Sequence, residues 1–208
     1  ILNDIDVVVF DFDGTIAHTM HIWGKINEEV LSEHGITTDI AKYQTEIAGK
    51  QMHDVALFTI DKFGLKVQPE VLMHLWKQKA KIAYKSCPFI GSADTFIKNI
   101  HSAGIKVGIA TASPTELIES FFEMHPEIRN CIHSVVSCDD VKKNKPDPAV
   151  FIECIKLLNG QKAVIFEDSV SGMRGARDSG SKVVGILSDQ SQLKEKEDLC
   201  DLLVLDYA

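Results

Sequence analysis

Short runs of apolar residues recur along the chain, and segments with helical periodicity separate most of them. Runs of this length, without polar alternation, are typical of parallel strands that are buried on both faces. Alternation of such strands with helices favours an α/β fold, a Rossmann-like doubly wound parallel sheet. The predicted strands are Val7–Phe10, Val107–Ala110, Val135–Val136, Ala163–Phe166, Val183–Leu187 and Leu202–Leu205.

The segment after the first predicted strand differs, because it carries helical periodicity and no convincing strand. Apolar residues recur there three or four positions apart and form helical stripes. We therefore expect an all-helical cap domain of residues 18–85, inserted into an α/β core domain of residues 1–17 and 86–208. A chain of 208 residues, 45% of them hydrophobic, is long enough for one such core with an insertion. The stripes are Trp23, Ile26, Val30 and Leu31; Val55, Ala56, Thr59 and Phe63; and Leu72, Leu75, Trp76, Lys79 and Ala83.

The charge and the cysteines limit the partners and the compartment. A net charge of -8 repels nucleic acids and anionic lipids, so a phosphate ligand has to meet a locally positive pocket. No apolar run is long enough to span a bilayer, and the five scattered cysteines form no Cys-x-x-Cys pair. We expect a cytoplasmic protein without nucleic-acid or membrane partners. Its oligomeric state, monomer or small homo-oligomer, is not specified by the sequence.

Two carboxylates directly follow the first predicted strand, in Asp11-Phe12-Asp13-Gly14-Thr15. Ligands of open α/β sheets bind at the carboxyl ends of the strands, where this motif falls. Period-two alternation points Asp11 and Asp13 to the same side, and Gly14 allows a sharp turn. Two like charges so close are costly unless a cation lies between them. Taken by itself, the motif also fits solvated carboxylates at a strand end, whereas an EF-hand calcium loop fails on spacing.

The second strand end carries hydroxyl groups, in Thr111-Ala112-Ser113-Pro114, before a predicted helix. Ser113 and Glu116 have capping-box spacing, and Pro114 falls at the first helical position. Thr111 is then expected between a strand end and a helix amino terminus, where free N–H groups favour an anion. A hydroxyl that only satisfies a turn fits this segment equally well.

Two further strand ends carry charge. Lys145 precedes Pro146 at the entrance of a helix that Asp147 is expected to cap, although a solvated surface lysine is the ordinary alternative. Asp168 offers a hard oxygen ligand of the kind that Mg2+ takes, and the adjacent Glu167 ligates through water or tunes the site. An acidic helix start is the alternative for this pair. Four strand ends at one sheet edge with acids, a hydroxyl and a lysine together outweigh the alternatives.

These segments resemble the motifs of the haloacid dehalogenase superfamily of phosphotransferases, in the subfamily with a helical cap inserted after the first motif. The resemblance covers nearly the whole chain and is strongest to the branch of sugar-phosphate phosphatases and β-phosphoglucomutases. The matching segments are Asp11 to Thr15, Thr111 to Ser113, Lys145 to Pro148 and Glu167 to Gly172.

The resemblance implies a phosphatase that acts on a small phosphorylated metabolite, with a sugar phosphate as the first expectation. Asp11 would attack phosphorus and become an aspartyl phosphate. Asp13 would protonate the leaving oxygen and then deprotonate the water that hydrolyses the intermediate. Thr111, together with Ala112, and Lys145 would bind the phosphoryl oxygens.

The resemblance also implies Mg2+ as the cofactor. Its ligands would be the Asp11 carboxylate, the Asp13 main-chain carbonyl and Asp168, with Glu167 as a further participant. The ion would reduce the repulsion between an anionic nucleophile and an anionic phosphate.

The match to the family is looser near the cap. Many relatives carry an acid shortly after the first motif, where this chain has His18. His18 either faces the substrate or is a polar residue at the cap hinge. Gly49 and Lys50 fall in a segment similar to the cap loop that reaches the substrate, although a solvated lysine is equally ordinary there. We include these three residues among the expected substrate-binding positions.

Several alternative activities share part of this pattern. A β-phosphoglucomutase-like phosphosugar mutase would carry the same motifs, and the Pro114-Thr115 pair weakens that interpretation without excluding it. A phosphonatase conflicts with Asp13, and a dehalogenase would lack the metal ligands. A catalytically idle binding module would not need both a nucleophile and an acid. The substrate is not specified: a hexose or deoxyhexose 6-phosphate is expected first, then phosphoglycolate or a nucleotide monophosphate.

Overall fold

The computed structural model describes residues 4–47, 52–187 and 192–207. Contacts within the chain divide it into two compact units, Ile1–His18 with Cys87–Ala208, and Thr19–Ser86. The first unit is α/β, and the second is helical. Among the helices of the described ranges, none is both long enough and apolar enough to cross a membrane.

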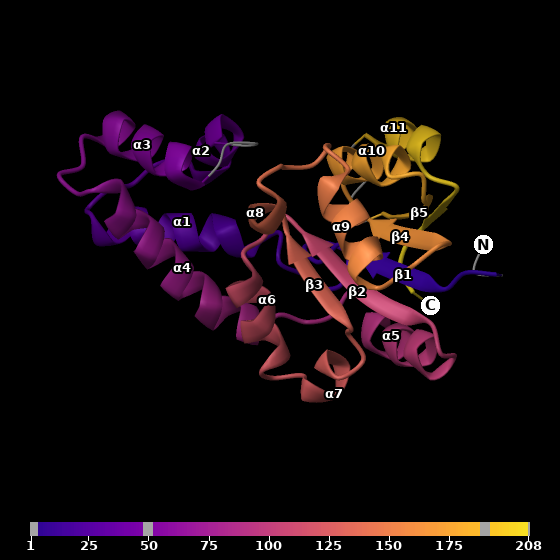
Figure 1. The fold of residues 1–208 in the computed structure, drawn as a ribbon. Coiled ribbons are helices and arrows are strands. Elements are labelled where there is room, and N and C mark those ends of the chain that lie inside the picture. Colours follow the sequence, from indigo (N-terminus) through magenta and orange to yellow (C-terminus); the bar gives the residue numbers. More distant parts are fainter. Residues whose placement is uncertain (1–3, 48–51, 188–191, 208) are drawn as a thin grey trace. The chain divides into compact units, whose positions relative to one another are not determined.

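Six parallel strands form the sheet of the first unit, in the order β3-β2-β1-β4-β5-β6 (Figure 1). The order reverses next to β1, because β2 and β3 lie on one side of it and β4, β5 and β6 on the other. Each predicted apolar run forms one of these strands, as expected for strands that are covered on both faces. The strands are β1 Val7–Phe10, β2 Lys106–Thr111, β3 Ser134–Ser137, β4 Ala163–Glu167, β5 Lys182–Ile186 and β6 Leu202–Val204.

Helices of the first unit pack on both faces of the sheet, which confirms the predicted doubly wound architecture. Val9 joins Phe151 and Met173 in a buried core cluster on one face. Phe10, the next residue of β1, points to the other face, where its ring meets that of Phe96 edge-on at 6.2 Å. Figure 1 shows α5 on the opposite side of the sheet from α9 and α10. The helices are α5 Ala93–Ser102, α6 Thr115–Phe122, α7 Pro126–Arg129, α8 Cys138–Val141, α9 Ala149–Leu157, α10 Val170–Asp178 and α11 Leu193–Leu199.

The second unit contains the three predicted helices and one that the sequence pattern missed, α2. In α2 only Tyr43 is buried, and the apolar positions Ile40, Tyr43 and Ile47 have a helical spacing that the prediction overlooked. The Tyr43 hydroxyl lies 2.6 Å from Thr59 Oγ1, which itself donates to the Val55 carbonyl, so Tyr43 is the donor and ties α2 to α3. The helices are α1 Ile22–Glu33, α2 Ile40–Ile47, α3 Met52–Phe63 and α4 Pro69–Lys85.

Two predicted helix starts are wrong in detail. Helix α6 begins at Thr115 with Pro114 at the N-cap, so Ser113 lies one position before the N-cap that the predicted capping box requires. Helix α9 has Pro148 rather than Asp147 at its N-cap. The Asp147 carboxylate still accepts the N–H of Ala149 at 3.0 Å, so the predicted cap is displaced by one position.

Candidate active site

The carboxyl ends of β1 and β4 lie side by side at the point where the strand order reverses. Open α/β sheets bind ligands at this position. Asp11 follows β1, and its N–H continues the strand pairing by donating to the Phe166 carbonyl at 2.9 Å. Glu167 ends β4, and Asp168 follows it. The three acidic residues are only 5%, 1% and 6% exposed, respectively. The fold therefore gathers three buried carboxylates at one point of the sheet edge.

These three carboxylates form an acidic cluster. One oxygen from each of Asp11, Glu167 and Asp168 lies within 4.8 Å of the other two. Burial, followed by repulsion from Glu167, raises the pKa of Asp11 well above its ordinary value of 3.8. Such a cluster is electrostatically unfavourable by itself, and a cation would relieve it. Hard oxygen donors at this separation fit Mg2+, so the residues present agree with the predicted cofactor.

Lys145 reaches into the acidic cluster from the loop between α8 and α9. Its Nζ lies 2.5 Å from Asp11 Oδ1 and 2.8 Å from Glu167 Oε2, and its side chain is 8% exposed. Burial works to lower the pKa of Lys145, but Asp11 and Glu167 outweigh it and raise the pKa above its ordinary value. Lys145 is therefore protonated at neutral pH. When the three acids are ionised, one ammonium group does not balance their charge. The negative charge that remains would favour the binding of a divalent cation.

Glu167 is fixed by the first turn of α10. Its Oε1 accepts the N–H of Asp168 at 3.1 Å, and the N–H and hydroxyl of Ser169 at 3.0 and 2.8 Å. A Cβ on Gly172 would overlap the Glu167 carboxylate, so the helix approaches closely only because this residue is glycine. Glycine is required in the same way at Gly14, where φ is +82° and a Cβ would overlap the Asp168 carboxylate.

Asp13 lies beyond β1 and meets the end of β2. Its Oδ2 accepts a hydrogen bond of 2.6 Å from the Ser113 hydroxyl, and Thr111 Oγ1 lies 3.5 Å from the same oxygen. Thr111 is fully buried and also accepts the N–H of Ser113 at 2.9 Å. The Ser113 hydroxyl therefore bonds to a residue of the predicted site instead of capping α6. Sequence reasoning missed this role, because a contact across 100 positions leaves no local signal.

The remaining predicted substrate-binding residues are not gathered at the acidic cluster. Ala112 is exposed at the end of β2. His18 is also exposed, and its main-chain N–H donates to the Pro88 carbonyl at 3.0 Å. Gly49 and Lys50 lie outside the described residues. The structure thus brings together Asp11, Lys145, Glu167 and Asp168, with Asp13 and Thr111 beside each other.

Tyr207 is a further residue at this end of the sheet, partly buried, which no motif of the sequence singled out. Its hydroxyl donates to the Thr15 carbonyl at 3.0 Å, and its ring packs beside those of Phe10 and Phe166. Burial, then the charges of Asp11 and Asp168, raise the pKa of Tyr207 well above its ordinary value. The end of the chain therefore supports the turn that follows the two predicted catalytic aspartates.

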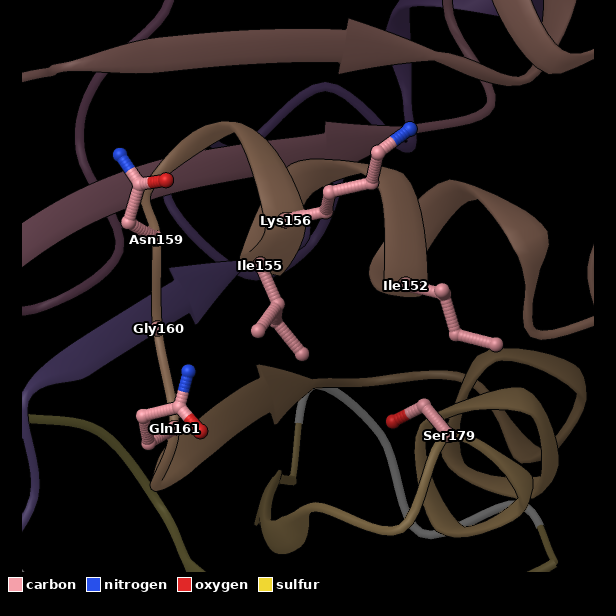
Figure 2. A pocket seen from close by; sticks show the side chains of 7 residues that line it. All are labelled: Ile152, Ile155, Lys156, Asn159, Gly160, Gln161 and Ser179. Carbon is pink, nitrogen blue, oxygen red and sulfur yellow. The ribbon is translucent and has the colours of Figure 1, made fainter.

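A separate hollow of about 420 Å³ lies at the other end of the strands, where their amino termini are (Figure 2). It is formed where α9 and α10 end and where the chain enters β4, which is the amino end of that strand. Figure 2 shows Ile152 and Ile155 of α9 facing Ser179 across it. The hollow is therefore distinct from the acidic cluster at the carboxyl ends. Its lining residues are Ile152, Ile155, Lys156, Asn159, Gly160, Gln161 and Ser179.

Residues 8–186 match the model of a protein family described as haloacid dehalogenase-like hydrolase. The chain is 26% identical to the bifunctional riboflavin kinase/FMN phosphatase of Arabidopsis thaliana, over 87% of this chain but only 48% of that protein. It is also 26% identical to a phosphorylated carbohydrates phosphatase of Thermotoga maritima, over 92% of this chain and 91% of that protein. The chain thus spans about half the length of the first relative and most of the second.

A solved structure with the same fold is that of CbbY from Rhodobacter sphaeroides in complex with phosphate. The TM-score is 0.81 at 19% identity, and the match covers 96% of this chain and 93% of that one. A likeness at this identity shows a shared fold alone. The activity of this chain has to be inferred from its own residues.

Proposed function

Because the chain belongs to the haloacid dehalogenase-like hydrolase family, we propose that it is a Mg2+-dependent phosphatase of a small phosphorylated metabolite. The observation that carries this proposal is the position of Asp11. It lies buried at the carboxyl end of β1, within 2.5 Å of Lys145, and in one cluster with Glu167 and Asp168. Buried acids beside an ammonium group have the shifted pKa values that are typical of functional sites, and this supports a role for Asp11 in reaction with a phosphate ester.

Asp11 is the nucleophile in this proposal. One of its carboxylate oxygens forms a bond to phosphorus while the ester bond between phosphorus and the leaving oxygen breaks. Lys145 favours the ionised form of Asp11 that this attack requires, because its ammonium group contacts Oδ1. Lys145 also adds positive charge where the phosphoryl group carries negative charge.

Asp13 is the general acid and then the general base. It donates a proton to the leaving oxygen as the ester bond breaks. A water molecule then attacks the aspartyl phosphate and transfers a proton to Asp13, which releases inorganic phosphate and restores both aspartates. Thr111 is suited to bind a phosphoryl oxygen at the end of β2, with Ala112 beside it.

Mg2+ would be held by Asp11, Asp168 and the main-chain carbonyl of Asp13, with Glu167 as a further participant. When bound, the ion supplies positive charge that lowers the repulsion between the carboxylate nucleophile and the phosphate dianion. The lower pKa that a cation would give Asp11 favours its reactive, ionised form.

The inserted helical segment, residues 18–85 in our assignment, is proposed to act as a cap domain that selects the substrate. His18, Gly49 and Lys50 are its proposed contributions to substrate binding. A sugar phosphate is the preferred class, which agrees with the phosphorylated carbohydrates phosphatase among the relatives. A hexose or deoxyhexose 6-phosphate is the first choice within it.

A phosphate-release screen with Mg2+ over sugar phosphates, phosphoglycolate, nucleotide monophosphates and phenyl phosphate tests the proposal. We expect release from at least one compound, and no release after Asp11→Asn or with EDTA. Isomerisation of a hexose 1-phosphate that outpaces phosphate release, with a trace of bisphosphate present, would instead identify a mutase. Release that persists in Asp11→Asn would contradict the proposed nucleophile.

A further inference from the structure

We propose that Ser113 is a positioning residue, which holds the Asp13 carboxylate in place for proton transfer. This inference rests on the proposed function, in which Asp13 is the acid and base. Ser113 Oγ donates a 2.6 Å hydrogen bond to Asp13 Oδ2, whereas Thr111 Oγ1 is 3.5 Å from that oxygen. A hydroxyl-to-carboxylate hydrogen bond of this length is in the strong range, and 3.5 Å is at the limit of hydrogen bonding. Of these two hydroxyl contacts, that of Ser113 therefore constrains the position of the carboxylate more strongly.

Ser113 is itself held at two main-chain points. Its N–H donates to Thr111 Oγ1 at 2.9 Å, and its carbonyl accepts the Ser137 hydroxyl at 3.0 Å. Ser137 is anchored in turn, because its N–H donates to Asp140 Oδ2 at 2.8 Å in the capping box of α8. The ends of β1, β2 and β3 are thus joined by one chain of hydrogen bonds. Asp13 Oδ2 is the acceptor through which β1 joins that chain.

Asp13 needs such support more than Asp11 does. Asp11 is buried and held by Lys145, whereas Asp13 is only partly buried and lies beyond the strand. A general acid has to stay within hydrogen-bond reach of the leaving oxygen, and a misplacement of about 1 Å can cost about a hundredfold in rate. A fixed donor on Oδ2 restricts rotation of the carboxylate and preserves that reach.

The test uses two substrates of similar shape that differ in their need for an acid. Phenyl phosphate releases a phenolate whose conjugate acid has a pKa of about 10, so protonation assists its departure. The phenolate from 2,4-dinitrophenyl phosphate is stable and leaves without a proton. The ratio kcat/KM reports the steps up to the first phosphoryl transfer, at which the acid acts. A defect in the acid therefore lowers kcat/KM for phenyl phosphate selectively.

We expect Ser113→Ala to lower kcat/KM for phenyl phosphate by about tenfold or more and that for the dinitrophenyl ester by less than about twofold. Ser113→Thr keeps the hydroxyl and should restore most of the loss. Ser120→Ala is the matched control, because it removes a buried hydroxyl of α6 that donates to the Glu116 carbonyl. This control should change neither substrate by more than about twofold.

Equal losses for the two esters in Ser113→Ala would show a general structural role and overturn the inference. Unchanged rates for both would overturn it as well. A wild-type protein that releases phosphate from neither ester and from no compound of the screen would overturn the proposed function, and the inference with it. Failure of the proposed function can be distinguished from failure of the inference, because it is seen in the wild-type protein before any variant is made.

Discussion

The Lys145 ammonium nitrogen lies 2.5 Å from Asp11 Oδ1, although the two residues are 134 positions apart. The same nitrogen lies 2.8 Å from Glu167 Oε2, and both pairs are almost completely shielded from solvent. One cation thus links the end of β1 to the end of β4. Its removal would leave two carboxylates buried without their ammonium partner.

Lys145→Met is expected to destabilise the metal-free protein by about 3–5 kcal/mol, because loss of one partner leaves the opposite buried charge uncompensated. Phosphate release should fall to background at the same time. The control is Lys156→Met, whose side chain is 73% exposed beside Glu153, and we expect a change within about 0.5 kcal/mol. Urea unfolding of wild type and the two variants at neutral pH measures these differences in stability. Equal stability of Lys145→Met and wild type would refute the account of this ion pair.

Mg2+ is expected to raise the melting temperature of the wild-type protein. The gain in unfolding free energy should approach about 2.7 kcal/mol at a hundredfold excess over the dissociation constant. Asp168→Asn removes one carboxylate of the acidic cluster and should abolish most of the gain. Asp198→Asn, at an exposed position, should retain it. Thermal scans with and without Mg2+ test this, and a full gain in Asp168→Asn would contradict the proposed ligand.

The raised pKa of Asp11 predicts how the stability of the metal-free protein depends on pH. Between the ordinary pKa of 3.8 and the raised pKa, folded Asp11 keeps a proton that the unfolded chain has released. The stability that the protonated Asp11 contributes is therefore fully present below pH 3.8. It is lost as the pH rises from there through the raised pKa of the folded state. Wild type should therefore lose stability relative to Asp11→Asn as the pH rises from about 4 toward neutrality. Parallel stability curves for the two proteins would show that Asp11 titrates normally.

Gly172→Ala is expected to act against the usual trend. Alanine in a helix ordinarily stabilises by about 0.5–1 kcal/mol relative to glycine. Here the new methyl group would overlap the Glu167 carboxylate, so we expect lower stability and weaker Mg2+-dependent activity. Unfolding measurements together with kinetics over a range of Mg2+ concentrations check this. A stabilised and fully active variant would mean that Glu167 can move without consequence.

The sequence was sufficient to predict the sheet, because buried parallel strands leave uninterrupted apolar runs such as Val7–Phe10. It also predicted that Asp11, Lys145 and Asp168 would meet, since parallel strands bring their carboxyl ends to one edge. Helix α2 was missed because its 8 residues carry only a short apolar stripe, Ile40, Tyr43 and Ile47. The Tyr43 to Thr59 contact, which ties α2 to α3, leaves no signal in the local sequence.

The same limit applies to the finer parts of the site. The local spacing of Ser113 and Glu116 predicts a cap, but Asp13 competes successfully for the Ser113 hydroxyl. Tyr207 reaches the Thr15 carbonyl from the far end of the chain, which no local pattern reports. Contacts of this kind depend on tertiary structure, so spacing in the sequence carries no signal for them.

The most direct test of the proposed mechanism is to trap the phosphorylated enzyme. Asp13→Asn cannot activate water, and 2,4-dinitrophenyl phosphate needs no acid, so the first step should proceed while the second stalls. After acid quenching, tandem mass spectrometry of the peptide that contains Asp11 should find the mass of one added phosphoryl group on that residue. Turnover without a label on Asp11, or with the label on another residue, would contradict the account.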